Sequence, residues 1–279
     1  MRLRSLLFVP GDRPDRIEKA LGSGADALIL DLEDAVVVAK KDEARKAIAA
    51  FLGRPRELSL FVRINPLDGG MADADLAAIL PAEPEGIVLP KAEGAGSLFD
   101  LAHRLEAAGN RGARILPIAT ETPAAVFTLG DYGGVSDRLC GLTWGAEDLP
   151  AAIGASTSRE ADGSYTAPYQ LARSLTLFGA HTAGVPAIET VYPDFRDLEG
   201  LKAYAERGLR DGFSGMMAIH PAQVPVINAA FTPTEAQAAH ARAVVAAFEA
   251  DPGAGALSLD GKMIDAPHLK AARRVLAAL

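Results

Sequence analysis

Cysteine is nearly absent from this sequence: Cys140 is the only one in 279 residues. A single thiol excludes an intramolecular disulfide and a thiolate metal cage, and such sparing use is typical of a reducing compartment. Cys140 also lies inside an apolar run, where inert packing is the expected role. The sequence therefore predicts a cytoplasmic protein.

Long apolar runs and clusters of basic residues are absent as well. No run approaches the roughly 18 apolar residues of a membrane-spanning helix. In "MRLRSLLFVPGDRP", Pro, Gly and Asp interrupt the apolar stretch before it reaches the length of a signal-peptide core. The net charge is -8, and neither nucleic acid nor an anionic membrane is an expected partner without clustered Lys and Arg. With 49% hydrophobic and 23% charged residues, the composition is that of a globular protein.

Several catalytic signatures are missing too. The sequence has no G-x-S-x-G elbow, no H-E-x-x-H and no Walker A loop, which argues against a triad hydrolase, a zinc protease and an NTPase. A G-x-G-x-x-G fingerprint is also missing, because the first strand-helix turn reads "VPGDRP" and "GAGS" at 94–97 is too short to count. An open dinucleotide-binding sheet is therefore the weaker of the two folds considered below.

Short apolar runs alternate with longer Ala-rich segments of helical periodicity throughout most of the chain. The apolar runs predict eight strands, at 5–10, 27–33, 59–65, 86–91, 114–120, 139–145, 186–192 and 215–220. The periodic segments predict helices at 12–23, 39–52, 72–80, 97–109, 122–130, 166–183, 197–211 and 221–229. A helix at 233–250, a break "DPGAGA", an apolar-polar segment "LSLDGKMID" and a helix from Pro267 follow.

Eight strands that are apolar along their whole length and alternate with helices indicate a parallel sheet covered by helices. Eight such units fit closure into a (β/α)8 TIM barrel, and a doubly wound open sheet is the alternative. We expect residues 1–230 to form the barrel and residues 231–279 to form a C-terminal helical extension that carries a lid segment.

Polar residues follow nearly every predicted strand, where a barrel places its chemistry. They are Asp31, Glu33, Asp34, Arg63, Asn65, Lys91, Thr120, Glu121, Thr122, Glu147, Asp148, Glu189 and His220. A single carboxylate in such a place is usually a helix cap. Several carboxylates in the mouth of the barrel, the end at which the strands have their carboxyl ends, repel each other unless a shared proton, a cation or a metal ion relieves the repulsion. Oxygen ligands favour Mg2+ over Mn2+, and Glu121 and Asp148 are the best pair.

The remaining polar residues allow more than one interpretation. Asp31 and Glu33 alternate with Leu32, so both are expected to point to the mouth and to support the metal site without binding the ion, as is Glu147. Asp34 is expected to turn into the following loop. Lys91 is either a salt-bridged cation or, less well supported, the Schiff-base lysine of a metal-free aldolase. Packing and function are equally open for His220.

Eight motifs occur in this order along the chain: "RSLLFVPGDRPDRIEKA", "LDLEDAV", "VRIN", "VLPKAE", "TETP", "WGAEDL", "IHPAQV" and "LDGKMIDAPHLKAAR". In order and spacing they resemble the motifs of the HpcH/HpaI aldolase and citrate lyase superfamily, in particular its citrate lyase β-subunit-like acyl-CoA lyases. The resemblance covers essentially the whole chain. It implies a barrel that assembles into homotrimers or homohexamers and cleaves 3-hydroxyacyl-CoA thioesters reversibly with Mg2+. The β subunit of a citrate lyase complex is the alternative.

The resemblance also implies roles for individual residues. Glu121 and Asp148 would bind the metal, with Glu121 also lining the substrate site, and Arg63 would contact the substrate. Asp265 would be the catalytic acid/base, delivered across a subunit interface by a lid hinged at "DPGAGA". The residues implied for coenzyme A and the substrate are Phe8, Arg13, Lys19, Ile219 and His220. Thr120 stands where members often have an aliphatic residue, and we expect its hydroxyl to orient the carboxylate of Glu121.

Overall fold

The computed structural model describes residues 1–55 and 57–279, in two compact units. Leu3–Asn228 form one unit, and Met1–Arg2 together with Ala229–Leu279 form the other. Among the described residues no helix is both long enough and apolar enough to cross a membrane.

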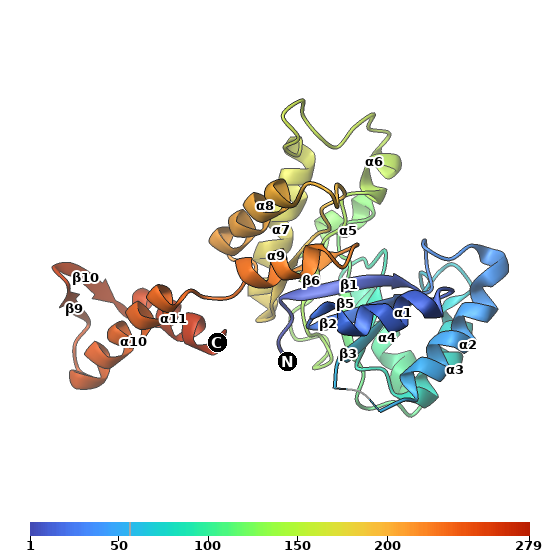
Figure 1. Cartoon of the computed structure of the whole chain (residues 1–279), viewed down its shortest axis with the longest axis horizontal. Helices are drawn as coiled ribbons and strands as arrows, with labels where there is room; N and C mark the ends of the chain where they lie inside the picture. Colours follow the sequence, from blue (N-terminus) through green and yellow to red (C-terminus); the bar gives the residue numbers. More distant parts are fainter. Residues whose placement is uncertain (56) are drawn as a thin grey trace. The chain divides into compact units, whose positions relative to one another are not determined.

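The larger unit is a barrel of eight parallel strands surrounded by helices, which confirms the predicted fold class (Figure 1). The strands are β1 (Ser5–Pro10), β2 (Ala27–Asp31), β3 (Ser59–Arg63), β4 (Gly86–Leu89), β5 (Arg114–Pro117), β6 (Leu142–Thr143), β7 (Ala187–Glu189) and β8 (Gly215–Ala218). They pair in the order β5-β4-β3-β2-β1-β8-β7-β6. Two parallel bridges, Ile115 to Leu139 and Ile118 to Thr143, link the two outer strands and close the barrel.

Alternate residues of the strands fill the inside of the barrel. Leu6, Ile29, Phe61, Leu116 and Ile188 belong to one buried cluster that draws on most of the strands. Because side chains on a strand alternate between faces, the residues two positions further along share that face. This places Phe8, Asp31 and Arg63 on the inner face, one layer closer to the carboxyl ends of β1, β2 and β3.

The covering helices follow the strands in sequence. They are α1 (Pro14–Ala20), α2 (Lys41–Leu52), α3 (Ala72–Ile79), α4 (Ala95–Ala107), α5 (Pro123–Phe127), α6 (Asp148–Ile153), α7 (Ala167–Ala183), α8 (Leu198–Asp211) and α9 (Gln223–Ala230). In Figure 1 the blue to teal helices lie on one side of the strands, and the green to gold helices lie on the other. Helix α6 was not predicted, because six residues that begin with "DLP" show no helical periodicity.

The smaller unit packs α10 (Glu235–Ala250) against α11 (Ala266–Ala277) through a separate apolar core. Between them lies an antiparallel hairpin, β9 (Ala256–Leu259) and β10 (Lys262–Asp265). The hairpin turns at Asp260 and Gly261, both at positive φ, which is the geometry that Asp-Gly favours in two-residue turns. The segment "LSLDGKMID" is therefore a β-hairpin.

Candidate active site

Arg63 is fixed by two carboxylates and a ring at the carboxyl ends of β1, β2 and β3. Its Nε and Nη2 donate to Asp31 Oδ1 and Oδ2 at 2.8 and 2.6 Å, and Nη1 lies 2.8 Å from Glu33 Oε2. The guanidinium carbon stands 4.9 Å from the centre of the Phe8 ring. Asp31 in turn accepts the backbone N–H of Glu33 at 2.8 Å. Bidentate pairing gives the guanidinium one orientation, with its remaining N–H groups free to meet a ligand.

Lys91 bridges the carboxylates of neighbouring strands. Its Nζ lies 2.7 Å from Glu33 Oε1 and 2.9 Å from Asp148 Oδ2, and its backbone N–H donates to Glu121 Oε2 at 2.6 Å. The backbone of Lys91 adopts a φ of 50, a conformation that costs energy for a residue with a side chain. Burial opposes the charge, but the hydrogen bond to Glu33 and the close carboxylate of Asp148 raise the pKa of Lys91. A protonated lysine is not a nucleophile, which argues against the Schiff-base alternative.

Glu121 is a buried carboxylate whose negative charge is poorly compensated. Only 7% of the residue is exposed, and burial, with Glu33 and Asp148 adding repulsion, raises the pKa of its carboxyl to about 8. Gly145 makes room for this side chain, because a Cβ there would lie 3.0 Å from Glu121 Cγ. A buried carboxylate beside two others is stabilised as an anion by a cation in the same place.

The arrangement fits a hard metal ion. Oxygen atoms of Glu33, Asp34 and Asp148 all lie within 4.8 Å of one another, and Glu121 approaches the same mouth. Glu33 Oε2 and Asp148 Oδ2 are buried and, although each takes part in an ion pair, neither has a hydrogen-bond partner of good geometry. Such atoms suit a metal ion, and carboxylate oxygens suit Mg2+ or Mn2+. Asp34 was expected to turn into the loop; it is exposed, yet one of its oxygens faces the mouth because the turn after β2 is tight.

Glu189 ends β7 but does not reach this mouth. Its neighbour Ile188 belongs to the interior cluster, so Glu189 points the opposite way, toward the covering helices. There it is fully buried and accepts hydrogen bonds from Trp144 Nε1, Tyr204 OH, the Thr190 backbone and Arg173 Nε, at 2.5, 2.9, 3.1 and 2.7 Å. Including Glu189 among the polar residues of the mouth was therefore wrong.

Thr120 also differs from expectation. Its hydroxyl donates to the carbonyl of Gly145 at 2.8 Å and accepts the N–H of Gly145 at 3.0 Å. It therefore ties the end of β5 to the turn before α6 and does not orient the carboxylate of Glu121. These two bonds join the segments that lead to Glu121 and Asp148.

The residues expected to hold coenzyme A and to line the substrate site are spread over the ends of β1 and β8. Arg13 precedes the seven-residue α1 and pairs with Asp15 at 3.2 Å, and Lys19 is exposed in the last turn of that helix. Gly11 lets this turn pass close to β2, since a Cβ would lie 2.6 Å from the carbonyl oxygen of Asp31.

On the β8 side, Ile219 is partly exposed, and the ring of His220 stacks on Phe195 with 4.9 Å between centroids. The backbone N–H groups of Ile219 and His220 both donate to Gln223 Oε1. Glu147, expected to support the metal site, precedes α6 with an exposed side chain.

Asp265 belongs to the smaller unit, where it caps α11. Its carboxylate and the ring of His268 form a reciprocal capping box, with Oδ1 2.5 Å from Nδ1. The side-chain bond to His268 is the main reason that the pKa of Asp265 lies below its usual value. A proton-abstracting carboxylate needs the opposite shift, so the role of Asp265 as acid/base stays a prediction.

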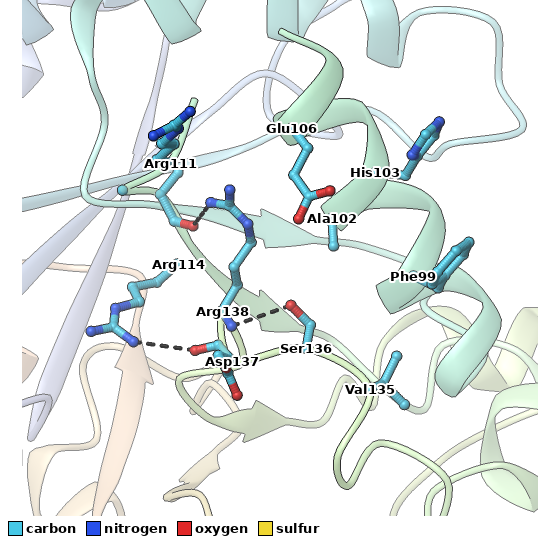
Figure 2. A pocket seen from close by; sticks show the side chains of 12 residues that line it. Phe99, Ala102, His103, Glu106, Arg111, Arg114, Val135, Ser136, Asp137 and Arg138 are labelled. Atoms are coloured by element: carbon cyan, nitrogen blue, oxygen red, sulfur yellow. Dashed lines mark hydrogen bonds between the residues drawn. The ribbon is translucent and has the colours of Figure 1, made fainter. Parts of the chain in front are cut away.

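Two pockets differ in their relation to this mouth. One of about 460 Å3 is lined by Lys91, Thr122 and the start of α4, and so adjoins the carboxylates. The other, of about 690 Å3, lies at the amino end of β5 and β6 beneath Phe99, His103 and Arg138 (Figure 2). In Figure 2 the Arg138 guanidinium donates to a neighbouring backbone carbonyl, and the Arg138 backbone N–H donates to Ser136. Among the described residues, Glu33, Glu121 and Asp148 line neither pocket, but Lys91, which pairs with Glu33 and Asp148, lines the smaller one. Strand carboxyl ends carry the chemistry of such barrels, which favours the smaller pocket.

Lys41 is a buried polar residue that went unnoticed in the sequence, and its partner Asn65 is one of the polar residues expected after the third strand. Lys41 and Asn65 lie behind the turn after β2 and are joined by a 2.8 Å hydrogen bond from Lys41 Nζ to Asn65 Oδ1. The "KK" at the start of α2 offered no signal, because a lysine in a first helical turn is ordinarily solvated.

Comparison with known proteins agrees with this fold. The sequence profile of the family described as HpcH/HpaI aldolase/citrate lyase matches residues 4–221. A "Citrate lyase subunit beta-like protein" of Mycobacterium tuberculosis (strain CDC 1551 / Oshkosh) is 39% identical over 97% of this chain and 93% of that protein. A "(3S)-malyl-CoA thioesterase" of Cereibacter sphaeroides (strain KD131 / KCTC 12085) is 34% identical over 98% of this chain and 93% of its own length.

Among solved structures, the protein CitE from Mycobacterium tuberculosis, crystallised with magnesium, acetoacetate and coenzyme A, superposes with a TM-score of 0.82. Its sequence identity is 35%, and the match covers 99% of this chain and 98% of that one. The chain therefore belongs to the HpcH/HpaI aldolase/citrate lyase family, and it is a lyase.

Proposed function

We propose that the protein is a Mg2+-dependent carbon-carbon lyase that reversibly cleaves a 3-hydroxyacyl-CoA thioester to an acyl-CoA and a 2-oxo acid. The substrate is of the malyl-CoA, methylmalyl-CoA or citramalyl-CoA type. The observation that carries the proposal is the meeting of Glu121, Asp148 and the oriented Arg63 at one end of the barrel. The names of the relatives, which include magnesium, coenzyme A and malyl-CoA, support the same chemistry.

Cleavage next to a hydroxyl requires that the hydroxyl lose its proton and that the departing carbon become an enolate. A bound Mg2+ would supply Lewis acidity toward the oxygens of the 2-oxo-acid half. Glu121 and Asp148 would hold it, with Glu33 and Asp34 close enough to bind its water. Lys91 and Arg63 limit the repulsion among these carboxylates, because each cation already pairs with Glu33.

Arg63 has the geometry for stabilising the developing negative charge. Two of its five N–H groups donate to Asp31, Nη1 forms an ion pair with Glu33, and 12% of its side chain remains exposed at the mouth. A fixed donor aimed at a developing oxyanion is worth roughly 3 to 4 kcal/mol when it is lost. The Phe8 ring beneath the guanidinium restricts its movement further.

The proton at the α-carbon of the acyl-CoA is assigned to Asp265. In the condensation direction its carboxylate would remove this proton, and in cleavage it would return it. We place Asp265 at the mouth of a neighbouring subunit of a homotrimer or homohexamer, where exclusion of water would raise its pKa above the present low value. Arg13, Lys19, Phe8, Ile219 and His220 are proposed to hold coenzyme A and the substrate.

The proposal is tested with purified protein, Mg2+ and a panel of 3-hydroxyacyl-CoA compounds, by following release of the acyl-CoA and the 2-oxo acid. Activity that EDTA leaves unchanged would overturn the metal role. Asp265→Asn should abolish turnover and retain coenzyme A binding. Mixed oligomers of Asp265→Asn and Glu121→Ala should regain part of the activity if Asp265 acts on a neighbour, and light scattering should report three or six chains.

The β subunit of a citrate lyase complex is the second candidate, favoured by the name of the 39% identical relative. Such a subunit would act on a citryl group carried by an acyl-carrier partner. His220 favours the stand-alone lyase slightly, because β subunits often have Asn in this motif. Turnover of a free CoA thioester without companion proteins would decide for the first candidate.

A further inference from the structure

Lys41 is a buried lysine that the proposed chemistry does not use. It is the first residue of α2, and 6% of it is exposed. Its Nζ donates to the carbonyl oxygens of Leu32 and Glu33 at 2.5 and 2.7 Å, and to Asn65 Oδ1 at 2.8 Å. The three protons of an ammonium group are therefore all used, each toward an oxygen that only accepts.

The acceptors of Lys41 belong to the turn that delivers Glu33 to the mouth. Lys41 holds the backbone carbonyl of Glu33, whereas the carboxylate of the same residue reaches Arg63 and Lys91 at 2.8 and 2.7 Å. Lys41 thus binds the main chain of Glu33, whereas Arg63 and Lys91 bind its side chain. Any shift of this backbone moves the carboxylate that holds both cations.

Asn65 extends the support to β3 and α3. Its side-chain amide donates to the carbonyl of Leu32 at 3.1 Å and to Asp75 Oδ2 at 2.7 Å. Asp75 is fully buried and also accepts Arg45 Nε at 2.7 Å. A hydrogen-bonded chain therefore joins α2, the turn after β2, the end of β3 and α3, all within the larger unit.

Burying the charged ammonium group of Lys41 costs free energy of folding. Burial lowers the pKa of Lys41, and the carboxylates of Asp31 and Asp75 act in the opposite sense. Apolar residues of similar volume generally stabilise a fold as well as a buried ionic group does. The buried charge therefore calls for an explanation beyond packing.

We propose that Lys41 is a positioning residue that fixes the backbone of Glu33, so that the Glu33 carboxylate holds Arg63 and Lys91 in place around Glu121 and Asp148. Its effect on metal binding rests on the proposed function, whereas its effect on the placement of Glu33 does not. Groups that orient the immediate surroundings of a metal typically change its affinity by about 10 to 100-fold.

The test compares the wild type with Lys41→Met, which keeps the length of the side chain and removes the donors. Crystal structures should show that the Glu33 carboxylate of the variant has left Arg63, Lys91 or both. Titration with Mn2+, followed by electron paramagnetic resonance, should give a dissociation constant about 10 to 100-fold higher. The Mg2+ concentration for half-maximal lyase activity should rise by the same factor, with turnover recovering to within about tenfold at saturating Mg2+.

Arg173→Met is the matched control, since Arg173 is a buried cation that pairs with Glu189 and Asp211 away from the mouth. It should lower the melting temperature but leave Mn2+ affinity and the Glu33 pairs unchanged. Lys41→Gln, with one amide donor left, serves if the methionine variant does not fold, and it should give an intermediate shift.

Intact Glu33 pairs in the Lys41 variant, or equal Mn2+ shifts in the Lys41 and Arg173 variants, would overturn the proposal. A wild type that binds no Mn2+ would overturn the proposed function instead, and the crystal comparison alone would then decide the role of Lys41.

Discussion

Glu121 and Glu189 are two buried glutamates near the carboxyl ends of barrel strands, and their surroundings differ in kind. Glu189 accepts four hydrogen bonds, including one from the guanidinium of Arg173. Within the described residues, Glu121 accepts one, from the backbone of Lys91, and faces two other carboxylates. A satisfied buried charge contributes to the structure, whereas one left short of partners indicates a site awaiting a ligand.

The largest effect on catalysis is expected from Glu121→Gln. If Glu121 binds the metal as proposed, loss of one of its ligand oxygens should lower turnover by about 100-fold or more at any practical Mg2+ concentration. The melting temperature should stay level or rise, because a neutral amide relieves the repulsion from Glu33 and Asp148. Steady-state kinetics and calorimetry check both parts. If Glu121→Gln were less stable but fully active, Glu121 would be a structural residue like Glu189.

Glu189→Gln should lower stability and leave activity nearly unchanged, the opposite of Glu121→Gln. Arg173 would keep one ion pair, with Asp211, but would lose the charge facing its Nε. Breaking a buried ion pair in this way typically lowers the free energy of unfolding by about 3 to 5 kcal/mol. Activity per folded molecule should stay within about twofold of the wild type, because Glu189 points away from the mouth. Urea unfolding, with activity measured below the transition, tests the prediction.

Arg63→Lys tests whether the fixed orientation of the guanidinium at the mouth matters for catalysis. Lysine keeps the charge but cannot make the bidentate bond to Asp31 or present further fixed donors. We expect kcat to fall by roughly 10 to 100-fold with little change in the KM for the CoA thioester. A pure rise in KM would assign Arg63 to substrate binding alone.

The smallest effect is expected from Tyr204→Phe. The change removes one of four donors to Glu189 without creating a cavity. A hydrogen bond to a charged group is worth about 1.5 to 3 kcal/mol, so the free energy of unfolding should fall by that amount or less. Lyase kinetics should not change. A change in kcat would mean that the Glu189 network and the mouth are coupled.

Much of the barrel could be predicted because burial on both faces leaves continuous apolar runs, as in "ALILD". The apolar runs predicted later strands that are too long: β6 and β7 have two and three residues, where seven each were predicted. Apolar character records burial and not hydrogen-bond pairing, and closure at β6 depends on isolated bridges that no local pattern encodes.

The sequence predicted which residues lie at the mouth, but not all of the hydrogen bonds that hold them there. Asp31, Glu33, Arg63, Lys91, Glu121 and Asp148 all lie where strand ends were expected to bring them. The sequence could not indicate that Lys41 supports them, since its partners are two backbone carbonyls and an amide 24 positions away. Neither could it show which bonds the Thr120 hydroxyl would make.

By itself the sequence determined the strand-helix alternation, the family and the carboxylates available for a metal. Tertiary structure decided which of those carboxylates share a site. In a buried parallel strand both faces are apolar, so alternation does not reveal which face is the inside. Only closure of the barrel turned Asp31 inward and Glu189 outward, and so made one glutamate part of the packing and left another, Glu121, in need of a cation.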